Sequence, residues 1–278
     1  MDDSPVAGEY PSPHLDMILE TDKVVGSLVK MIEGRQLEED TIIIFTSDNG
    51  GLNPILTPGT VEAGHLSNGN LRGMKGSIYE GGHRVPMIWR QDGVLPAGEK
   101  RDHLLGLNDI FATLCEIAGV EIPENSAMDS VSFADYLLSS NSTTDLRSTL
   151  GHWEYNMMTN EIAADSLRMG DLKVIRDFVN NTIELYDLSN DLYESNDMSS
   201  LYSYKFQLRT MLSELEEIGP CPADKRGKFK LRNGKRKNCK WFGKRKNRCK
   251  RFASDGLMRC PSTCSRHPKT CNQMRSNN

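Results

Sequence analysis

The stretch Thr41-Ile-Ile-Ile-Phe-Thr46, followed directly by Ser47-Asp-Asn-Gly-Gly51, decides the fold class of this chain. Its short, unbroken run of β-branched residues predicts a strand buried on both faces, as in a parallel sheet with helical cover. Before it, residues 14–34 carry apolar residues at helical spacing and end at Gly34, a favourable helix cap. A helix leading into a buried strand is half of an α/β repeat, so we expect an α/β domain.

The residues just after this strand have the chemistry of a cation site. Asp48 and Asn49 offer a carboxylate and an amide oxygen where open α/β sheets place their ligands. Hard cations such as Ca²⁺ take oxygen ligands of this kind. An ordinary Asp-Asn-Gly turn is the competing interpretation.

A second polar segment follows a long Gly- and Asn-rich loop. Lys75 lies between two glycines, where it can meet an oxyanion as a point charge, although a solvated surface lysine has the same pattern. Glu80 and Arg84 add charge beside this loop, as does Arg72. We expect Arg84 to hold the loop in place by ion pairing rather than to bind substrate.

The remainder of the body divides into two parts. Residues 85–89 predict another buried strand, and residues 108–118 and 132–138 predict helices. From residue 148 the pattern changes to short strands at 150–155, 166–169, 172–178 and 182–188, with turn signals between them, and then a helix up to residue 218. We therefore predict an α/β part over 1–147, a small antiparallel-sheet subdomain over 148–219, and a tail over 220–278.

Charge and cysteine separate the tail from the body. Residues 221–278 hold 19 of the 34 Lys and Arg but two of the 38 Asp and Glu, a net charge of +17 against −21 for residues 1–220. Six of the seven cysteines also lie there. They predict a disulfide-rich module made in an oxidising compartment, and their spacing disfavours zinc. These six are Cys221, Cys239, Cys249, Cys260, Cys264 and Cys271.

The basic tail suits a polyanion, and for an oxidised module a sulfated polysaccharide suits better than nucleic acid. A solubilising tail, or one that pairs with the acidic body, is the alternative. No apolar run is long enough for a membrane-spanning helix, and the polar start of the chain contains no signal peptide.

Three motifs together resemble the arylsulfatase-type sulfatase family. They are Ile42-Ile-Ile-Phe-Thr-Ser-Asp-Asn-Gly-Gly51, Leu71-Arg-Gly-Met-Lys-Gly76 and Tyr79-Glu-Gly-Gly-His-Arg-Val-Pro86. Residues 107–119, 167–175 and 184–197 extend the resemblance, which covers about residues 14–218. It implies an alkaline-phosphatase-like fold, with a mixed or parallel sheet sandwiched by helices, that hydrolyses sulfate esters.

The resemblance also implies a site. A formylglycine made from cysteine attacks sulfur in this family, and a bound Ca²⁺ holds the sulfate. By motif position, Asp48 and Asn49 would be metal ligands and Lys75 would contact the sulfate. His65, in the loop between them, is either a contact for the rest of the substrate or a solvated histidine. The family also implies a secretory-pathway location, as the tail cysteines do.

The nucleophile motif, Cys or Ser-x-Pro or Ala-x-Arg, is absent: Cys115 is followed by Glu-Ile-Ala-Gly, and none of the tail cysteines fits. We therefore predict either a fragment of a sulfatase or a degenerate, secreted relative that binds polyanions. In both cases the chain as it stands is expected to be inactive.

Overall fold

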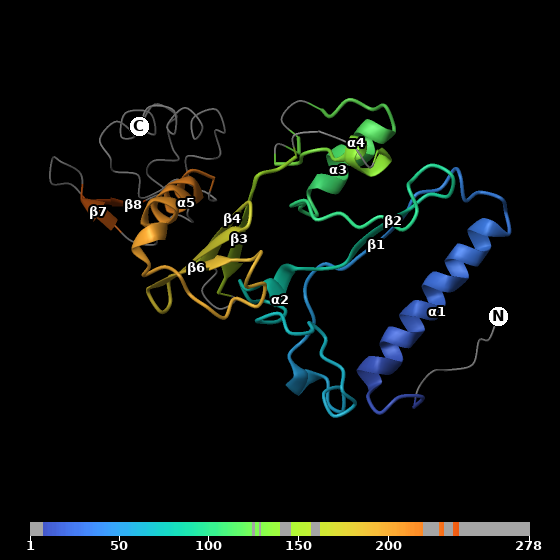
Figure 1. Ribbon diagram of the computed structural model, residues 1–278, viewed down its shortest axis with the longest axis horizontal. Helices are drawn as coiled ribbons and strands as arrows, with labels where there is room; N and C mark the ends of the chain where they lie inside the picture. The colour runs from blue at the N-terminus through green and yellow to red at the C-terminus, as the bar shows by residue number, and fades with distance from the viewer. Residues whose placement is uncertain are drawn as a thin grey trace.

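The computed structural model describes residues 8–123, 126–127, 129–139, 146–156, 162–218, 228–230 and 236–238. In this part of the chain a helical and two-stranded region is followed by a four-stranded sheet and its helix (Figure 1). All six tail cysteines lie outside the described residues, so their predicted disulfides do too.

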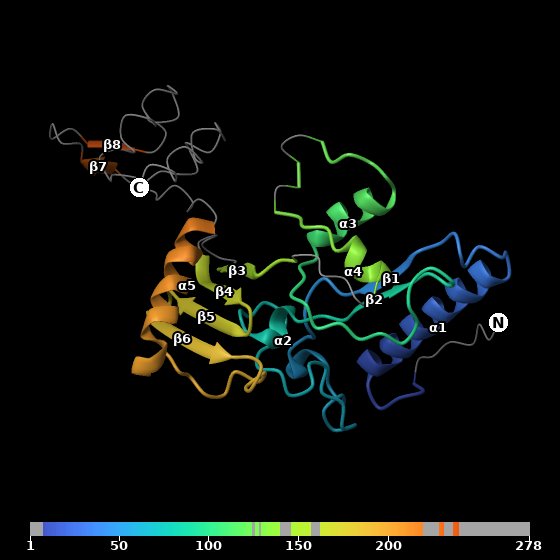
Figure 2. The ribbon, with the colours of Figure 1, turned by 45° about the horizontal axis from the view of Figure 1, so that its top comes forward.

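The first region is built around a pair of short strands. It contains α1 (Pro13–Glu33), β1 (Ile43–Thr46), a 3-10 turn (Pro54–Leu56), α2 (Glu80–His83), β2 (Met87–Arg90), α3 (Asp109–Ile117) and α4 (Ala134–Leu138). Figures 1 and 2 show α1 on one side of the β1–β2 pair and α3 and α4 on the other. The helices and strands predicted for this region are confirmed, with ends displaced by a few residues.

The parallel arrangement predicted for the first strand is wrong for the described residues. β1 pairs with β2 in antiparallel register, Ile43 opposite Arg90 and Thr46 opposite Met87. Its side chains are half-buried, and Phe45 is 38% exposed. An unbroken apolar strand of this kind normally packs between two layers, and the described residues do not bury both of its faces. The helix α1 shows the same deficit, since Ile18 and Leu28 of its apolar set are largely exposed.

The second region is the predicted antiparallel sheet. Its strands are β3 (Thr149–Tyr155), β4 (Ile162–Met169), β5 (Leu172–Asp177) and β6 (Thr182–Asp187), paired in chain order. The predicted turns at residues 170–171 and 180–181 are confirmed, and Gly170 and Asn181 both take positive φ there. A 3-10 turn (Tyr202–Tyr204) then leads into α5 (Lys205–Ile218), and β7 (Lys228–Lys230) and β8 (Arg236–Asn238) form a separate hairpin.

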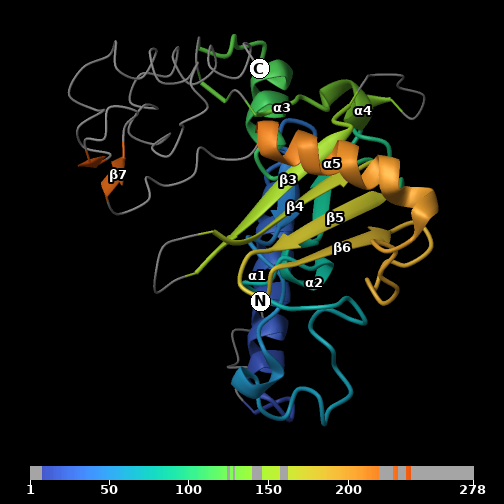
Figure 3. The same cartoon turned by 90° about the vertical axis from the view of Figure 1, so that its left-hand side faces the viewer.

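The two faces of the sheet have different chemistry. On one face α5 lies across the strands (Figure 3), and Leu167, Val174 and Leu185 pack against Met211 and Leu215 with almost no exposure. Side chains alternate between the faces of a strand, so their neighbours in sequence point the other way.

On that opposite face, Ile175 and Tyr186 pack on Ile78, which belongs to the loop that carries Lys75. The same face holds the charged and polar side chains of His152, Ser166 and Lys173. The sheet therefore uses one face as an apolar core and the other to hold the loop.

Candidate functional site

Asp48 and Asn49 lie in the turn that leaves β1, as predicted. The carboxylate of Asp48 is exposed, and Asn49 Nδ2 donates to the Gly50 carbonyl at 2.9 Å. Gly50 is buried, its N–H donates to Gly82 O at 2.9 Å, and a Cβ at Gly50 would collide with the Gly81 carbonyl. The sequence Asp-Asn-Gly-Gly is therefore a close-packed junction between two loops and not a free surface turn.

The Lys75 loop is the other half of this junction. The backbone N–H of Lys75 donates to Gly51 O at 2.8 Å, which brings Lys75 beside the Asp48–Asn49 turn. Gly73 and Gly76 take φ values of +84° and +87°, a region that other residues rarely adopt. The two flanking glycines allow the chain to turn sharply here, and the side chain of Lys75 is exposed at the tip of the loop.

Arg72 anchors this loop to the small sheet. Its guanidinium donates to Tyr186 Oη at 2.8 Å, to Glu194 O at 3.0 Å and to Tyr79 Oη at 3.0 Å, and stacks over the Tyr79 ring at 3.7 Å. Burial and the adjacent Glu184 carboxylate raise the pKa of Tyr79 to about 12. Arg72 thus holds the Lys75 loop against the small sheet.

Glu80 and Arg84 form a second anchor, which is buried. Arg84 NH1 pairs with Glu80 Oε2 at 3.0 Å, four residues earlier in the same loop, and Lys173 Nζ pairs with Glu80 Oε1 at 2.9 Å and with Glu194 Oε1 at 2.7 Å. Lys173 is 1% exposed. Burial alone would raise the pKa of Glu80, but Lys173, His83 and Arg84 lower it to about 2. Glu80 is therefore an anion that depends on its partners.

Two stacked histidines adjoin this anchor. The rings of His83 and His152 lie 4.6 Å apart, and His83 Nε2 is 3.2 Å from Lys173 Nζ. Burial first, and then the positive charge of Lys173, lower the pKa of His83 to about 4, and the pKa of His152 is lowered for the same reasons. Both imidazoles are therefore neutral near pH 7.

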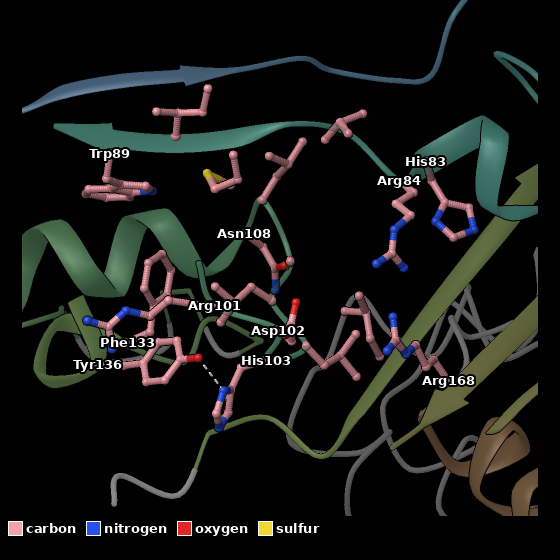
Figure 4. A pocket seen from close by; sticks show the side chains of 18 of the residues that line it. His83, Arg84, Trp89, Arg101, Asp102, His103, Asn108, Phe133, Tyr136 and Arg168 are labelled. Carbon is pink, nitrogen blue, oxygen red and sulfur yellow. Dashed lines mark hydrogen bonds between the residues drawn. The ribbon is translucent and has the colours of Figure 1, made fainter. Parts of the chain in front are cut away.

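A cavity of about 880 Å³ extends from Asp48 and this anchor to the aromatic side chains near α4. Figure 4 shows its contents: Arg84 and Arg168 at one end, Trp89, Phe133 and Tyr136 at the other, with Asp102 between. Lys75 and His65 are not among its lining residues. His65 lies near His14, with the two ring centroids 6.4 Å apart, so its role in substrate contact stays a prediction.

The oxygen ligands at this junction suit a hard cation in kind but fall short of it in number. Ca²⁺ takes six to eight oxygens. Among the described residues no group of three or more His, Cys, Asp or Glu is arranged to hold a metal ion. Two side chains are too few to hold such an ion by themselves, so the ligand role of Asp48 and Asn49 stays a prediction.

Sequence reasoning missed Lys173, Glu194 and Arg168. The alternation of β4 and β5 contained a signal, since Arg168 and Lys173 fall on the face away from the apolar positions. One face of the sheet is occupied by α5. Charged residues of both strands on the opposite face indicate that this opposite face is covered too.

Comparison with known proteins identifies the family. The model named N-sulphoglucosamine sulphohydrolase, C-terminal, matches residues 74–219, more than half of the chain, and the Sulfatase model matches residues 5–120. The chain belongs to the sulfatase family. The resemblance noted from the three motifs is thereby confirmed.

Two relatives illustrate how much of a sulfatase is present. An N-acetylgalactosamine-6-O-sulfatase of Bacteroides thetaiotaomicron is 32% identical over 219 residues, covering 73% of this chain and 40% of that protein. Human steryl-sulfatase is 37% identical over 115 residues, which are 41% of this chain and 19% of that enzyme. This sulfatase-family chain therefore spans less than half the length of the relatives that it matches.

Solved structures agree on the fold. A Bacteroides thetaiotaomicron sulfatase from a study of glycosaminoglycan metabolism matches with a TM-score of 0.65 and 27% identity, over 77% of this chain and 46% of that one. Ps i-CgsB, crystallised with k-i-k-neocarrahexaose, matches with a TM-score of 0.60 and 26% identity, over 73% and 41% of the two chains. Among the described residues of this chain, no helix is long and apolar enough to cross a membrane.

Proposed function

We propose that this chain contributes to sulfate ester hydrolysis, with Asp48 and Asn49 as ligands of a Ca²⁺ ion and Lys75 as the cation that contacts the sulfate. The observation that carries this proposal is the junction in which Lys75 N donates to Gly51 O at 2.8 Å. It brings the only lysine of the glycine loop beside the two oxygen ligands, although 25 residues separate them in sequence.

The chemistry follows from the charges. When the alcohol leaves a sulfate ester, negative charge builds up on the oxygen atoms of the reacting group. Positive groups that are already held in place stabilise that charge. A bound Ca²⁺ would supply Lewis acidity at the sulfate oxygens. Lys75 would add a point charge, held in place because Arg72 and Glu80 fix both ends of its loop.

Calcium titration by calorimetry tests the metal site. We expect Ca²⁺ to bind the purified chain, Asp48→Ala to abolish or greatly weaken binding, and Asp22→Ala, an exposed carboxylate on α1, to leave it unchanged. Equal binding by the Asp48→Ala and Asp22→Ala proteins would refute the assignment, as would a chain that binds no Ca²⁺.

A second candidate is a binding protein on a sulfatase scaffold, supported by the absence of the Cys-x-Pro-x-Arg type of motif from the sequence. In this proposal the chain is secreted and holds sulfated polysaccharide through its basic tail. Turnover of an aryl sulfate by the purified chain, above that of an Asp48→Ala control, would exclude it. Polysaccharide binding without turnover, lost when residues 221–278 are removed, would favour it.

A further inference from the structure

Arg168 has a positive charge that no described acidic side chain balances. Its Nε donates to Gly170 O at 2.9 Å, and no ion pair joins its guanidinium to any described carboxylate. It lies directly opposite Lys173 in the register of β4 and β5, so two cations are neighbours on one face of the sheet. Like charges placed opposite each other destabilise a sheet.

The carboxylates of the buried anchor pair with cations other than Arg168. Lys173 pairs with both Glu80 and Glu194, and Arg84 pairs with Glu80, whereas Arg168 pairs with neither carboxylate. The neighbouring histidines are neutral near pH 7. A cation at a cavity wall without a protein counter-ion is a place for an anionic ligand.

The same cavity offers surfaces for the rest of such a ligand. Figure 4 shows the guanidinium groups of Arg84 and Arg168 projecting into one end of the cavity, and the rings of Trp89 and Phe133 at the other. Aromatic faces of this kind suit the ring of a sugar.

We propose that Arg168, with Arg84, binds a second acidic group of the substrate, a carboxylate or sulfate on a saccharide that also presents its ester sulfate to Asp48 and Lys75. This inference rests on the proposed function, because Asp48 lines the same cavity. It assigns the substrate class as an acidic saccharide with at least two negative groups. Arg84 keeps one side of its guanidinium on Glu80, so Arg168 supplies the unpaired charge.

The test compares two probes in a calorimetric titration of the full chain. One is a monosaccharide 6-sulfate, and the other is a disaccharide with a uronate carboxylate beside the same sulfate. We expect the disaccharide to bind more tightly, and Arg168→Gln to weaken its binding about tenfold or more, because hydrogen bonds to charged groups contribute on that scale. Binding of the monosaccharide should change less than twofold.

Two variants serve as controls. Arg209→Gln removes an exposed arginine of α5 and should leave both affinities unchanged, and Arg168→Lys should restore part of the disaccharide affinity. Thermal unfolding of each variant checks that the fold is retained. The proposal is overturned if Arg168→Gln binds the disaccharide as tightly as the original chain, or if the original chain does not prefer the disaccharide.

Repeating the titrations with a calcium chelator separates this inference from the proposed function. If Asp48→Ala shows that Asp48 does not bind Ca²⁺, the effect of Arg168→Gln in chelator still reports on the cavity alone. A preference for the disaccharide that persists there supports the arginine site even when the metal assignment fails. Its loss in Arg209→Gln as well as in Arg168→Gln would refute the site.

Discussion

Replacing Lys173 by methionine should be among the most destabilising single changes in this protein. The lysine is 1% exposed and is the shared cation of Glu80 and Glu194, whose side chains are 3% and 0% exposed. Methionine keeps most of the stem but leaves the buried carboxylate of Glu194 without a cation and that of Glu80 with Arg84 alone. Breaking a buried pair by removing one partner costs about 3–5 kcal/mol. For a protein whose total stability is on the order of 5–15 kcal/mol, that is a large fraction.

The measurement is urea unfolding followed by tryptophan fluorescence, since Trp153 packs in the core of the small sheet. The matched control is Lys205→Met, an exposed lysine at the start of α5, which we expect to change the free energy of unfolding by less than about 0.5 kcal/mol. Adding Glu194→Gln to Lys173→Met should recover part of the loss by removing the carboxylate that has lost its cation. A loss below about 1 kcal/mol for Lys173→Met alone would contradict our account of the anchor.

Three further changes test other parts of the structure. The pKa of His83 falls from 6.5 to about 4 on folding, so the unfolded chain binds more protons than the folded chain between these pH values. The free energy of unfolding should therefore fall by up to about 3 kcal/mol as the pH drops from 6.5 to 4. Urea titrations at a series of pH values should show this slope, and His83→Gln should flatten it. Gly50→Ala should lower both stability and Ca²⁺ affinity, because its Cβ would strike the Gly81 carbonyl. Gly26→Ala, which has open space around it inside α1, should raise the unfolding midpoint slightly. A more stable Gly50→Ala protein and a less stable Gly26→Ala protein would refute the packed junction. Leu215→Ala should cost about 2–5 kcal/mol in the same unfolding assay, and a neutral result would show that α5 does not complete the core.

The fold was predictable wherever the sequence pattern is local. The helix from Pro13 and the four antiparallel strands follow from residue spacing and turn residues, and the structure confirms them. The direction of β1 was not predictable in this way, since the run Ile42-Ile-Ile reports burial and not the identity of the neighbouring strand. A strand's neighbours are determined by distant parts of a chain, and apolar content alone does not specify their direction.

The site divides along a similar line. Short sequence motifs contain Asp48, Asn49 and Lys75, and their chemistry can be predicted from those motifs. The hydrogen bond from Lys75 N to Gly51 O brings the motifs together. Lys173 and Arg168 stand in ordinary strand sequence, and their importance depends on register. Only the pairing of β4 with β5 places the two cations opposite each other, and only the fold brings Glu80 within 2.9 Å of Lys173 Nζ.

The anchor also explains why the Lys75 loop and the small sheet belong to one structural unit. The apolar face of the sheet packs on α5, which comes from the same part of the chain. The opposite face depends on the Lys75 loop, because Lys173 pairs with Glu80, and Ile175 and Tyr186 pack on Ile78. The family model that covers the sheet accordingly begins at residue 74, within the Lys75 loop, and not at the first strand of the sheet. The position of Lys75 thus depends on buried charges nearly 100 residues away, and a change on the sheet's inner face acts on the proposed sulfate site without touching it.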